Sequence, residues 1–223
     1  MAVLISVWGA SPGVGKSTLC AGLVGWLADA GLRVDHFREE EVLTRPQFSA
    51  VAESFERTGA VDVATLIAAT AEFVDSVLVD GDDVVVADAL VPYIPTVLAM
   101  GHEEETIGAF MTELTAVLAP VSPVMVFLDG NAEAALSRAV RREGARWLDW
   151  YVGKLAAYAV SPPVTDLASA VTYLRRERAV TLGAMARHEW DLVVIERADE
   201  LSRSEVLRAA QRSLRPWLGT ATR

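Results

Sequence analysis

Several residue types are scarce in this chain of 223 residues, and each scarcity excludes a class of structure or function. Cys20 is the single cysteine, so an internal disulfide bond is impossible and a cysteine-based zinc site would lack its ligands. Positive charge is also scarce. The formal net charge of -10 and the isoelectric point near 4.8 argue against a surface that follows nucleic-acid phosphates.

Long apolar runs are missing too. A bilayer-spanning helix needs about 20 apolar residues, and the longer apolar stretches here are interrupted by Glu72 and Asp75 or by Asp88 and Pro92. The opening run 1–8 lacks a basic leader and a small-residue cleavage site, so no targeting segment is expected. We therefore expect a cytoplasmic protein that binds neither membrane nor nucleic acid.

The remaining composition, 52% hydrophobic and 22% charged, is that of a globular protein. Short apolar segments alternate with helical stretches along the chain. The expected strands are 3–8, 32–37, 84–88, 124–128 and 192–196; the main expected helices are 16–30, 47–57, 61–79, 104–118, one opening at 131, 147–160, 166–189 and 201–214. Such alternation produces a parallel sheet covered on both faces. We predict a single α/β domain over residues 1–223, with a five-stranded parallel sheet between two helical layers.

The turn after the first strand carries the most specific motif. Residues 9–18 read Gly-Ala-Ser-Pro-Gly-Val-Gly-Lys-Ser-Thr, which is a P-loop in which Ala10 replaces the first glycine. Glycines let successive backbone N–H groups point at phosphate oxygens, and the helix N-terminus adds positive potential. The expected nucleotide-binding residues are Gly13, Val14, Gly15, Lys16, Ser17 and Thr18.

Within this motif, Lys16 is expected to bridge the β- and γ-phosphates and Ser17 to ligate Mg²⁺. Lysine occurs only twice in the chain, as Lys16 and Lys154, which makes Lys16 the more notable. The guanine-reading pattern Asn/Thr-Lys-x-Asp is absent, because Lys154 is followed by Leu-Ala. We therefore expect ATP rather than GTP, together with Mg²⁺.

Further segments, taken in order, resemble the P-loop nucleoside and nucleotide kinases, a family that includes deoxynucleoside and thymidylate kinases. They are His-Phe-Arg-Glu-Glu at 36–40, Val-Val-Val-Ala-Asp at 84–88, Leu-Asp-Gly at 128–130, the arginine-bearing segment 135–142 and the helix after it. The resemblance implies a three-layer P-loop NTPase fold with a helical lid at about residues 141–150. It also implies an ATP-dependent phosphotransferase.

The resemblance assigns roles to residues near the strand ends. It implies that Glu39 is the general base and that Asp88 is catalytic and holds Mg²⁺, while Arg38, Glu40 and Tyr93 would face the acceptor. A carboxylate past a strand end stands where α/β sheets bind ligands. Glu39 could equally belong to a solvated acidic loop, and Asp88 could cap a turn.

The lid arginines have a physical rationale. Arg138, Arg141 and Arg142 share one helix face at i, i+3 and i+4. Charge spreads over the phosphoryl oxygens in the transition state, so we expect Arg138 and Arg142 to act in catalysis. The alternative is a solvated basic helix end that interacts only with the helix dipole.

Departures from the family pattern concern the acceptor. Asp88 is followed by Ala89 rather than arginine, and the helix around 64–77 contains no arginine for an acceptor phosphate. Only Arg38 remains of the acceptor-side cations, while Glu39 to Glu41 add negative charge. We therefore expect the hydroxyl of a neutral or cationic small molecule, such as a nucleoside, an amino sugar or a specialised metabolite, rather than a nucleoside monophosphate. The sequence leaves open whether the protein forms a homodimer.

A nucleoside monophosphate kinase of the thymidylate type is nevertheless retained as an alternative. The segments 11–18 and 27–34 also resemble ParA/MinD-type dimeric ATPases and dethiobiotin synthetases. The dimeric ATPases have a signature lysine where Ser11 stands, and they usually end the second strand in Asp, where Phe-Arg-Glu stands here. Both differences count against a nucleotide-switched partner protein. A carboxylate-activating ligase and a regulatory ATP-binding module remain open.

Overall fold

The chain forms one parallel sheet with helices on both faces. The computed structural model describes residues 1–9, 11–159 and 162–219. Within these residues the sheet is five-stranded, with the order β2-β3-β1-β4-β5 and every pairing parallel. The strands are β1 (Val3–Trp8), β2 (Val34–Phe37), β3 (Val84–Asp88), β4 (Ser122–Leu128) and β5 (Asp191–Ile195).

The helices follow the strands in sequence. They are α1 (Lys16–Asp29), the 3-10 turns η1 (Glu39–Leu43) and η2 (Pro46–Phe48), α2 (Ser49–Thr58), α3 (Val63–Asp80), α4 (Ile94–Ala99), α5 (Glu104–Val117), α6 (Ala132–Glu143), α7 (Ala145–Ala156), α8 (Leu167–Arg187) and α9 (Arg203–Leu218). None of the helices within the described residues is long and apolar enough to cross a membrane.

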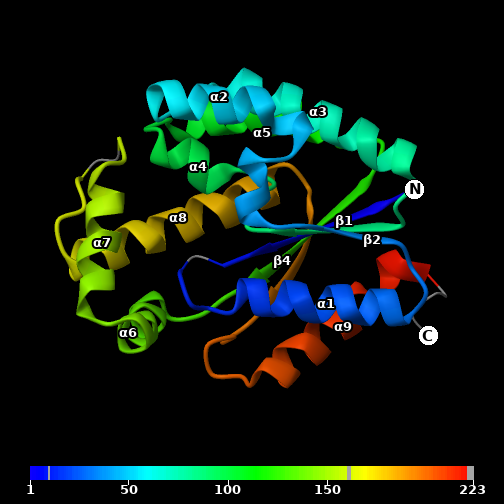
Figure 1. Ribbon diagram of the computed structural model, residues 1–223. Helices are drawn as coiled ribbons and strands as arrows, with labels where there is room; N and C mark the ends of the chain where they lie inside the picture. The colour runs from blue at the N-terminus through cyan, green and yellow to red at the C-terminus, as the bar shows by residue number, and fades with distance from the viewer. Residues whose placement is uncertain (10, 160–161, 220–223) are drawn as a thin grey trace.

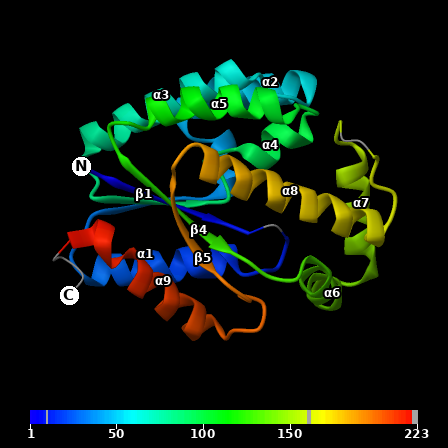
Figure 2. The same cartoon turned by 180° about the vertical axis from the view of Figure 1, so that it is seen from behind.

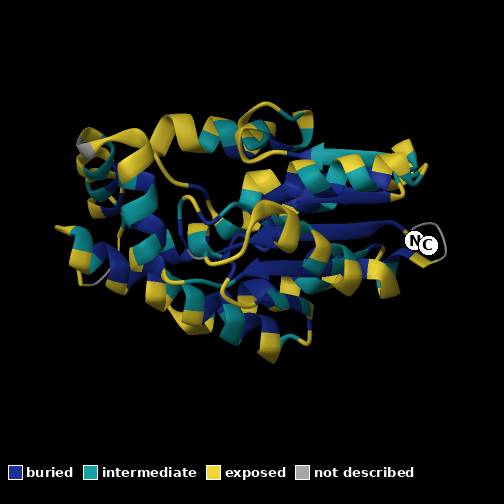
Figure 3. Ribbon diagram, turned by 90° about the horizontal axis from the view of Figure 1, so that it is seen from below, coloured by how far each residue is buried: buried dark blue, intermediate teal, exposed yellow. Residues whose placement is uncertain are grey.

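Two cores lie on opposite faces of the sheet. Helices α1 and α9 cover one face, while α3, α5 and α8 lie over the other (Figures 1 and 2). Alternate residues of β1 point to different cores: Ile5 packs with Leu23 of α1, whereas Leu4 packs in the cluster that contains Phe73 of α3. Figure 3 shows the buried strands between helices whose outer faces are exposed.

Side-chain caps determine where several helices begin. The Asn131 side chain accepts hydrogen bonds from the N–H groups of Glu133 (3.0 Å) and Ala134 (3.1 Å), which starts α6. Ser202 and Glu205 form a reciprocal capping box at the start of α9. Local side-chain chemistry thus places the helices on either side of the fifth strand.

The predicted α/β class and the five-stranded parallel sheet are confirmed. Some details differ from expectation. The Pro-containing segment after β3, which lies outside the main expected helices, contains the short helix α4. The helix opening at 131 ends at Glu143, and α7 begins immediately after Gly144, whose φ of 92° and ψ of 170° favour glycine. The region expected to form a lid therefore spans a break between two helices.

Candidate functional site

The carboxyl ends of the strands gather the polar residues of the candidate site. Because all five described strands are parallel, these ends share one edge of the sheet, on the side of α6 and α7 (Figure 1). Val7 of β1 pairs with Asp88 of β3, and Ala87 pairs with Phe37 of β2. The strand β3 lies between β1 and β2, unlike the dinucleotide-binding order, in which the first two strands are neighbours. Glu39 and Asp88 therefore follow adjacent strands.

The glycine-rich turn leaves β1 and leads directly into α1. Gly13 and Gly15 have φ values of 79° and 109°, a backbone region that strongly favours glycine. Lys16 is the first residue of α1, and its Nζ donates to the carbonyl oxygens of Ser11 (3.3 Å) and Gly9 (3.5 Å). The ammonium group is thereby kept over the turn. Ala10, which replaces the first glycine of the P-loop pattern, lies outside the described residues.

An open polar cleft lies over this turn, with a volume of about 470 Å³. It brings together the turn, one acidic residue after β2, two arginines of α6 and the segment around the start of α9. The lining residues are Gly13, Val14, Gly15, Lys16, Ser17, Thr18, Leu19, Glu39, Arg138, Arg142, Ala198, Asp199, Leu201, Arg203 and Val206. All the residues predicted to bind the nucleotide therefore line one cavity.

The cations of the cleft come from three elements. Arg138 and Arg142 project from α6, while Arg203 begins α9 and Lys16 begins α1. Arg138 forms an ion pair with Asp199 (3.7 Å), and the Nε of Arg142 donates to Glu143 (2.6 Å). Arg142 remains largely exposed, with 64% of its side-chain surface accessible. Arg142 could turn toward phosphate oxygens at little cost, because its exposed ion pair with Glu143 contributes little free energy.

Asp88 ends β3 beneath the turn. Its side chain is buried, and its Oδ1 has no hydrogen-bond partner among residues 1–9, 11–159 and 162–219. Burial, followed by the negative charge of Asp88, raises the pKa of the neighbouring Cys20 thiol, while the charge of Lys16 opposes this. Cys20 is consequently an inert thiol, and Asp88 stands close to α1. An unpaired buried carboxylate oxygen is costly, so a ligand that contacts it would be favoured.

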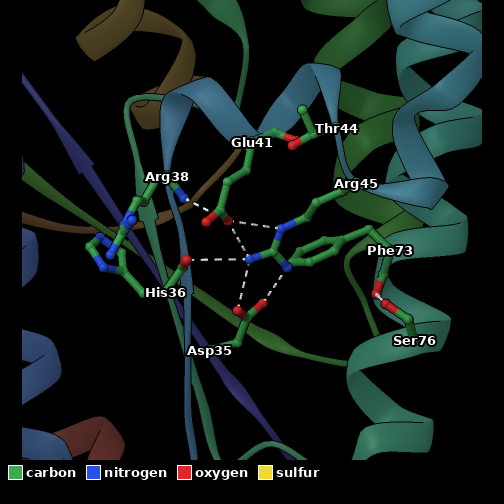
Figure 4. Close-up of polar contacts among 8 residues, drawn as sticks. All are labelled: Asp35, His36, Arg38, Glu41, Thr44, Arg45, Phe73 and Ser76. Atoms are coloured by element: carbon green, nitrogen blue, oxygen red, sulfur yellow. Dashed lines mark hydrogen bonds and ion pairs between the residues drawn. The ribbon is translucent and has the colours of Figure 1, made fainter.

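The turn that carries Glu39 is held by Arg45 (Figure 4). Nη1 and Nη2 of Arg45 donate to both carboxylate oxygens of Asp35 (2.6 and 2.8 Å), and Nη2 also donates to Glu41 (2.8 Å). The guanidinium lies 4.2 Å from the centroid of the Phe37 ring. This cluster of Asp35, Phe37, Glu41 and Arg45, here called the Arg45 clamp, connects β2 to η1 and fixes the turn between them.

The three residues expected to face the acceptor have different positions. Arg38 and Glu40 are exposed and do not belong to the cleft lining, and the Arg38 N–H donates to Glu41 (3.4 Å). Tyr93 lies in the core with 2% of its surface exposed, and its hydroxyl accepts from Thr70 (3.3 Å). Its position against buried Thr70 explains the difference, and we no longer propose Tyr93 as an acceptor-lining residue.

Several residues near the site were missed by the sequence analysis. Asp199 and Arg203 line the cleft, and the strand-end rule applied to β5 could have found Asp199. Asp129, in the Leu-Asp-Gly segment after β4, accepts from Arg178 (2.7 and 2.5 Å) and so fixes α8 to the end of β4. The hydrogen bonds from Arg178 lower the pKa of Asp129. The sequence carried no signal for this long-range pair.

The sequence of the chain was also compared with those of known proteins. No protein-family model matches the chain, and no curated protein matches it in sequence.

Proposed function

We propose that this protein is an ATP-dependent kinase that transfers the γ-phosphoryl group to the hydroxyl of a neutral or cationic small molecule. The observation that carries the proposal is the composition of the cleft. A glycine-rich turn, the Lys16 ammonium, two α6 arginines and the Glu39 carboxylate line one cavity at the carboxyl edge of a parallel sheet. Phosphoryl transfer requires this combination of positioned cations and a proton acceptor.

The proposed roles follow from these positions. The backbone N–H groups of the turn and Lys16 would hold the triphosphate, while Arg138 and Arg142 would approach its terminal oxygens from α6. Ser17 and Asp88 would hold Mg²⁺, and the unpaired Oδ1 of Asp88 fits that role. When bound, Mg²⁺ would neutralise charge on the phosphate oxygens.

The proposed reaction is a displacement at the γ-phosphorus of ATP. The acceptor oxygen attacks the γ-phosphorus, and Glu39 accepts the hydroxyl proton. A bond forms between the acceptor oxygen and phosphorus, while the bond between the γ-phosphorus and the bridging oxygen breaks. ADP leaves with the electron pair of that bond. Glu39 lines the same cleft as Lys16, which supports its role as the base.

The test replaces Lys16 by alanine. Loss of the ammonium should reduce phosphoryl transfer at least about a thousandfold, because a central charge-stabilising group is removed. Binding of an ATP analogue with Mg²⁺ should weaken as well, and calorimetry would measure it. The matched control for ATP binding is Lys154→Ala, which removes the other lysine from the exposed face of α7. Equal ATP binding by the wild type and the Lys16→Ala variant would contradict the proposal.

A further inference from the structure

A second polar cluster lies near Lys16, on α7, α8 and the segment after α7. It contains Tyr151, Tyr158, Tyr173 and Glu177, here called the tyrosine cluster. Tyr151 and Tyr173 are buried, with 7% and 5% of their surfaces exposed. The rings of Tyr158 and Tyr173 have centroids 6.3 Å apart in a tilted arrangement. The cluster belongs to elements other than those that line the cleft.

Glu177 supplies the carboxyl group of the cluster. It lies one helical turn after Tyr173 and forms no ion pair with any residue that the structure describes. Burial raises its pKa to about 7, although the charges of Lys16 and Lys154 and the side chain of Tyr173 act in the opposite direction. The negative charge of Glu177 in turn contributes to a raised pKa in Tyr151, Tyr158 and Tyr173, after burial. Glu177 therefore lies near enough to act on all three tyrosines.

A polar atom in this cluster lacks a partner. The Tyr173 hydroxyl is buried and forms no hydrogen bond of regular geometry in the described part of the chain, although the Glu177 carboxyl one helical turn later lies near enough to raise its pKa. Leaving a buried hydroxyl unpaired costs free energy, so a ligand that hydrogen-bonds to it would be stabilised. The tyrosine faces also offer negative potential to a cation. In a core that serves only packing, buried polar groups such as this hydroxyl are normally hydrogen-bonded.

The cluster is connected to the proposed catalytic groups. The charge of Lys16 acts on Glu177, and the charge of Glu39 contributes to the raised pKa of Tyr158. Glu39 thus lies near the tyrosine cluster while also lining the cleft. Arg178, the residue after Glu177, is held by Asp129 at the end of β4, which fixes this part of α8 relative to the sheet.

We propose that the tyrosine cluster is the acceptor subsite and that it binds a ring-bearing or sugar-like amino alcohol, with the protonated amine against Glu177 and the hydroxyl toward Glu39. This inference rests on the proposed function and specifies its substrate class. An ammonium group would give Glu177 a direct ion-pair partner, which none of the described residues provides, and the Tyr173 hydroxyl would gain a hydrogen-bond partner. An anionic acceptor would instead meet Glu39 and Glu177 with like charge.

The experiment compares matched probes that differ in charge. Glucosamine, glucose and glucuronic acid form one set; phenylethanolamine, styrene glycol and mandelic acid form the other. Each is offered to the wild-type protein with and without ATP and Mg²⁺, and both affinity and γ-phosphoryl transfer are measured. We expect at least one amine to bind about tenfold more tightly than its neutral partner, as a charge-assisted contact would give.

Variants then assign the preference to the subsite. Glu177→Gln should remove the roughly tenfold preference for the amine while retaining ATP binding, and Tyr173→Phe should weaken binding of both the amine and the neutral probe. Glu113→Gln, on the exposed face of α5, is the matched control and should keep the preference. A preference that survives in Glu177→Gln would overturn the inference, as would tighter binding of a neutral or anionic probe or no binding of either amine.

The failures of the two proposals are distinguishable. If ATP does not bind but the amine preference depends on Glu177, the subsite is supported and the kinase proposal fails. If ATP binds and phosphoryl transfer goes to glucose or to styrene glycol in preference to the amines, the kinase proposal stands and the subsite is overturned.

Discussion

Two groups of residues near Lys16, the cleft lining and the tyrosine cluster, differ in charge and in exposure to solvent. The cleft contains four cationic side chains, those of Lys16, Arg138, Arg142 and Arg203, and its arginines remain accessible to solvent. The tyrosine cluster contains the buried rings of Tyr151 and Tyr173, the half-buried Tyr158 and the Glu177 carboxyl. Cations can stabilise a transferring phosphoryl group, whereas a desolvated carboxyl favours a cationic partner. The contrast teaches that one lysine can stand between the site proposed for a polyanion and the site proposed for a cation.

Glu39 lines the cleft and also lies near the tyrosine cluster. Its replacement by glutamine should therefore have the largest effect on the proposed reaction. The change keeps the shape of the side chain but removes the proton acceptor. Phosphoryl transfer should fall about a thousandfold, or about 4 kcal/mol in activation free energy, while ATP affinity stays within about twofold. Single-turnover kinetics would measure the chemical step. Glu53→Gln on exposed α2 is the control, and an unchanged rate in Glu39→Gln would remove this residue from the mechanism.

Replacement of Arg142 by alanine tests the cationic side alone. We expect transfer to fall about a hundredfold, because one of the groups that would neutralise the terminal phosphate is lost. Arg141→Ala is a matched control, since Arg141 is on the same helix but does not line the cleft. Similar losses in both variants would mean that general positive charge on α6, rather than the position of Arg142, matters. A dimerising ATPase would chiefly lose partner binding, which sedimentation would detect.

The Glu177 carboxyl of the tyrosine cluster should make the free energy of unfolding depend on pH. The pKa of Glu177 rises from 4.5 to about 7 on folding, so the folded state binds this proton more tightly than the unfolded state. The associated stability is present below pH 4.5 and is lost as the pH rises toward 7. Relative to Glu177→Gln, the wild type should lose about 2 kcal/mol over this range, a value reduced for partial solvent screening.

Denaturant unfolding at several pH values would measure that loss. Glu113→Gln should follow the wild-type curve, because Glu113 is exposed on α5. Parallel curves for the wild type and Glu177→Gln would show that Glu177 has the same proton affinity in the folded and unfolded chains. Glu177 would then no longer be a titrating group that distinguishes the tyrosine cluster from the cleft.

The sequence predicts the layout of the sheet well because the relevant signals are local. Runs such as Val84–Val86 specify strands by themselves, and Asn131 caps its helix through neighbours only two and three residues away. The cleft-lining turn could be predicted for the same reason, from the closely spaced Gly13 and Gly15 before Lys16. Its role in binding nucleotide stays a prediction.

Long-range contacts could not be predicted in the same way. Tyr93 follows β3 as an acceptor residue would, but its hydroxyl meets Thr70 on another helix. Arg178 and Asp129 lie 49 residues apart, and nothing in either local pattern indicates their contact. The environment of Glu177 likewise depends on the packing of α7, α8 and the turn before α1. These properties arise only when separate elements meet.

The Arg45 clamp has a consequence for the order of events at the proposed site. Each of its contacts joins residues within 35–45 or reaches Phe73 of α3, so it needs no ligand to assemble. The Glu39 backbone is therefore already in place when an acceptor arrives, and binding need not order this turn. Affinity would then report the contacts of the acceptor itself, and the proton acceptor would be equally available to every molecule that fits.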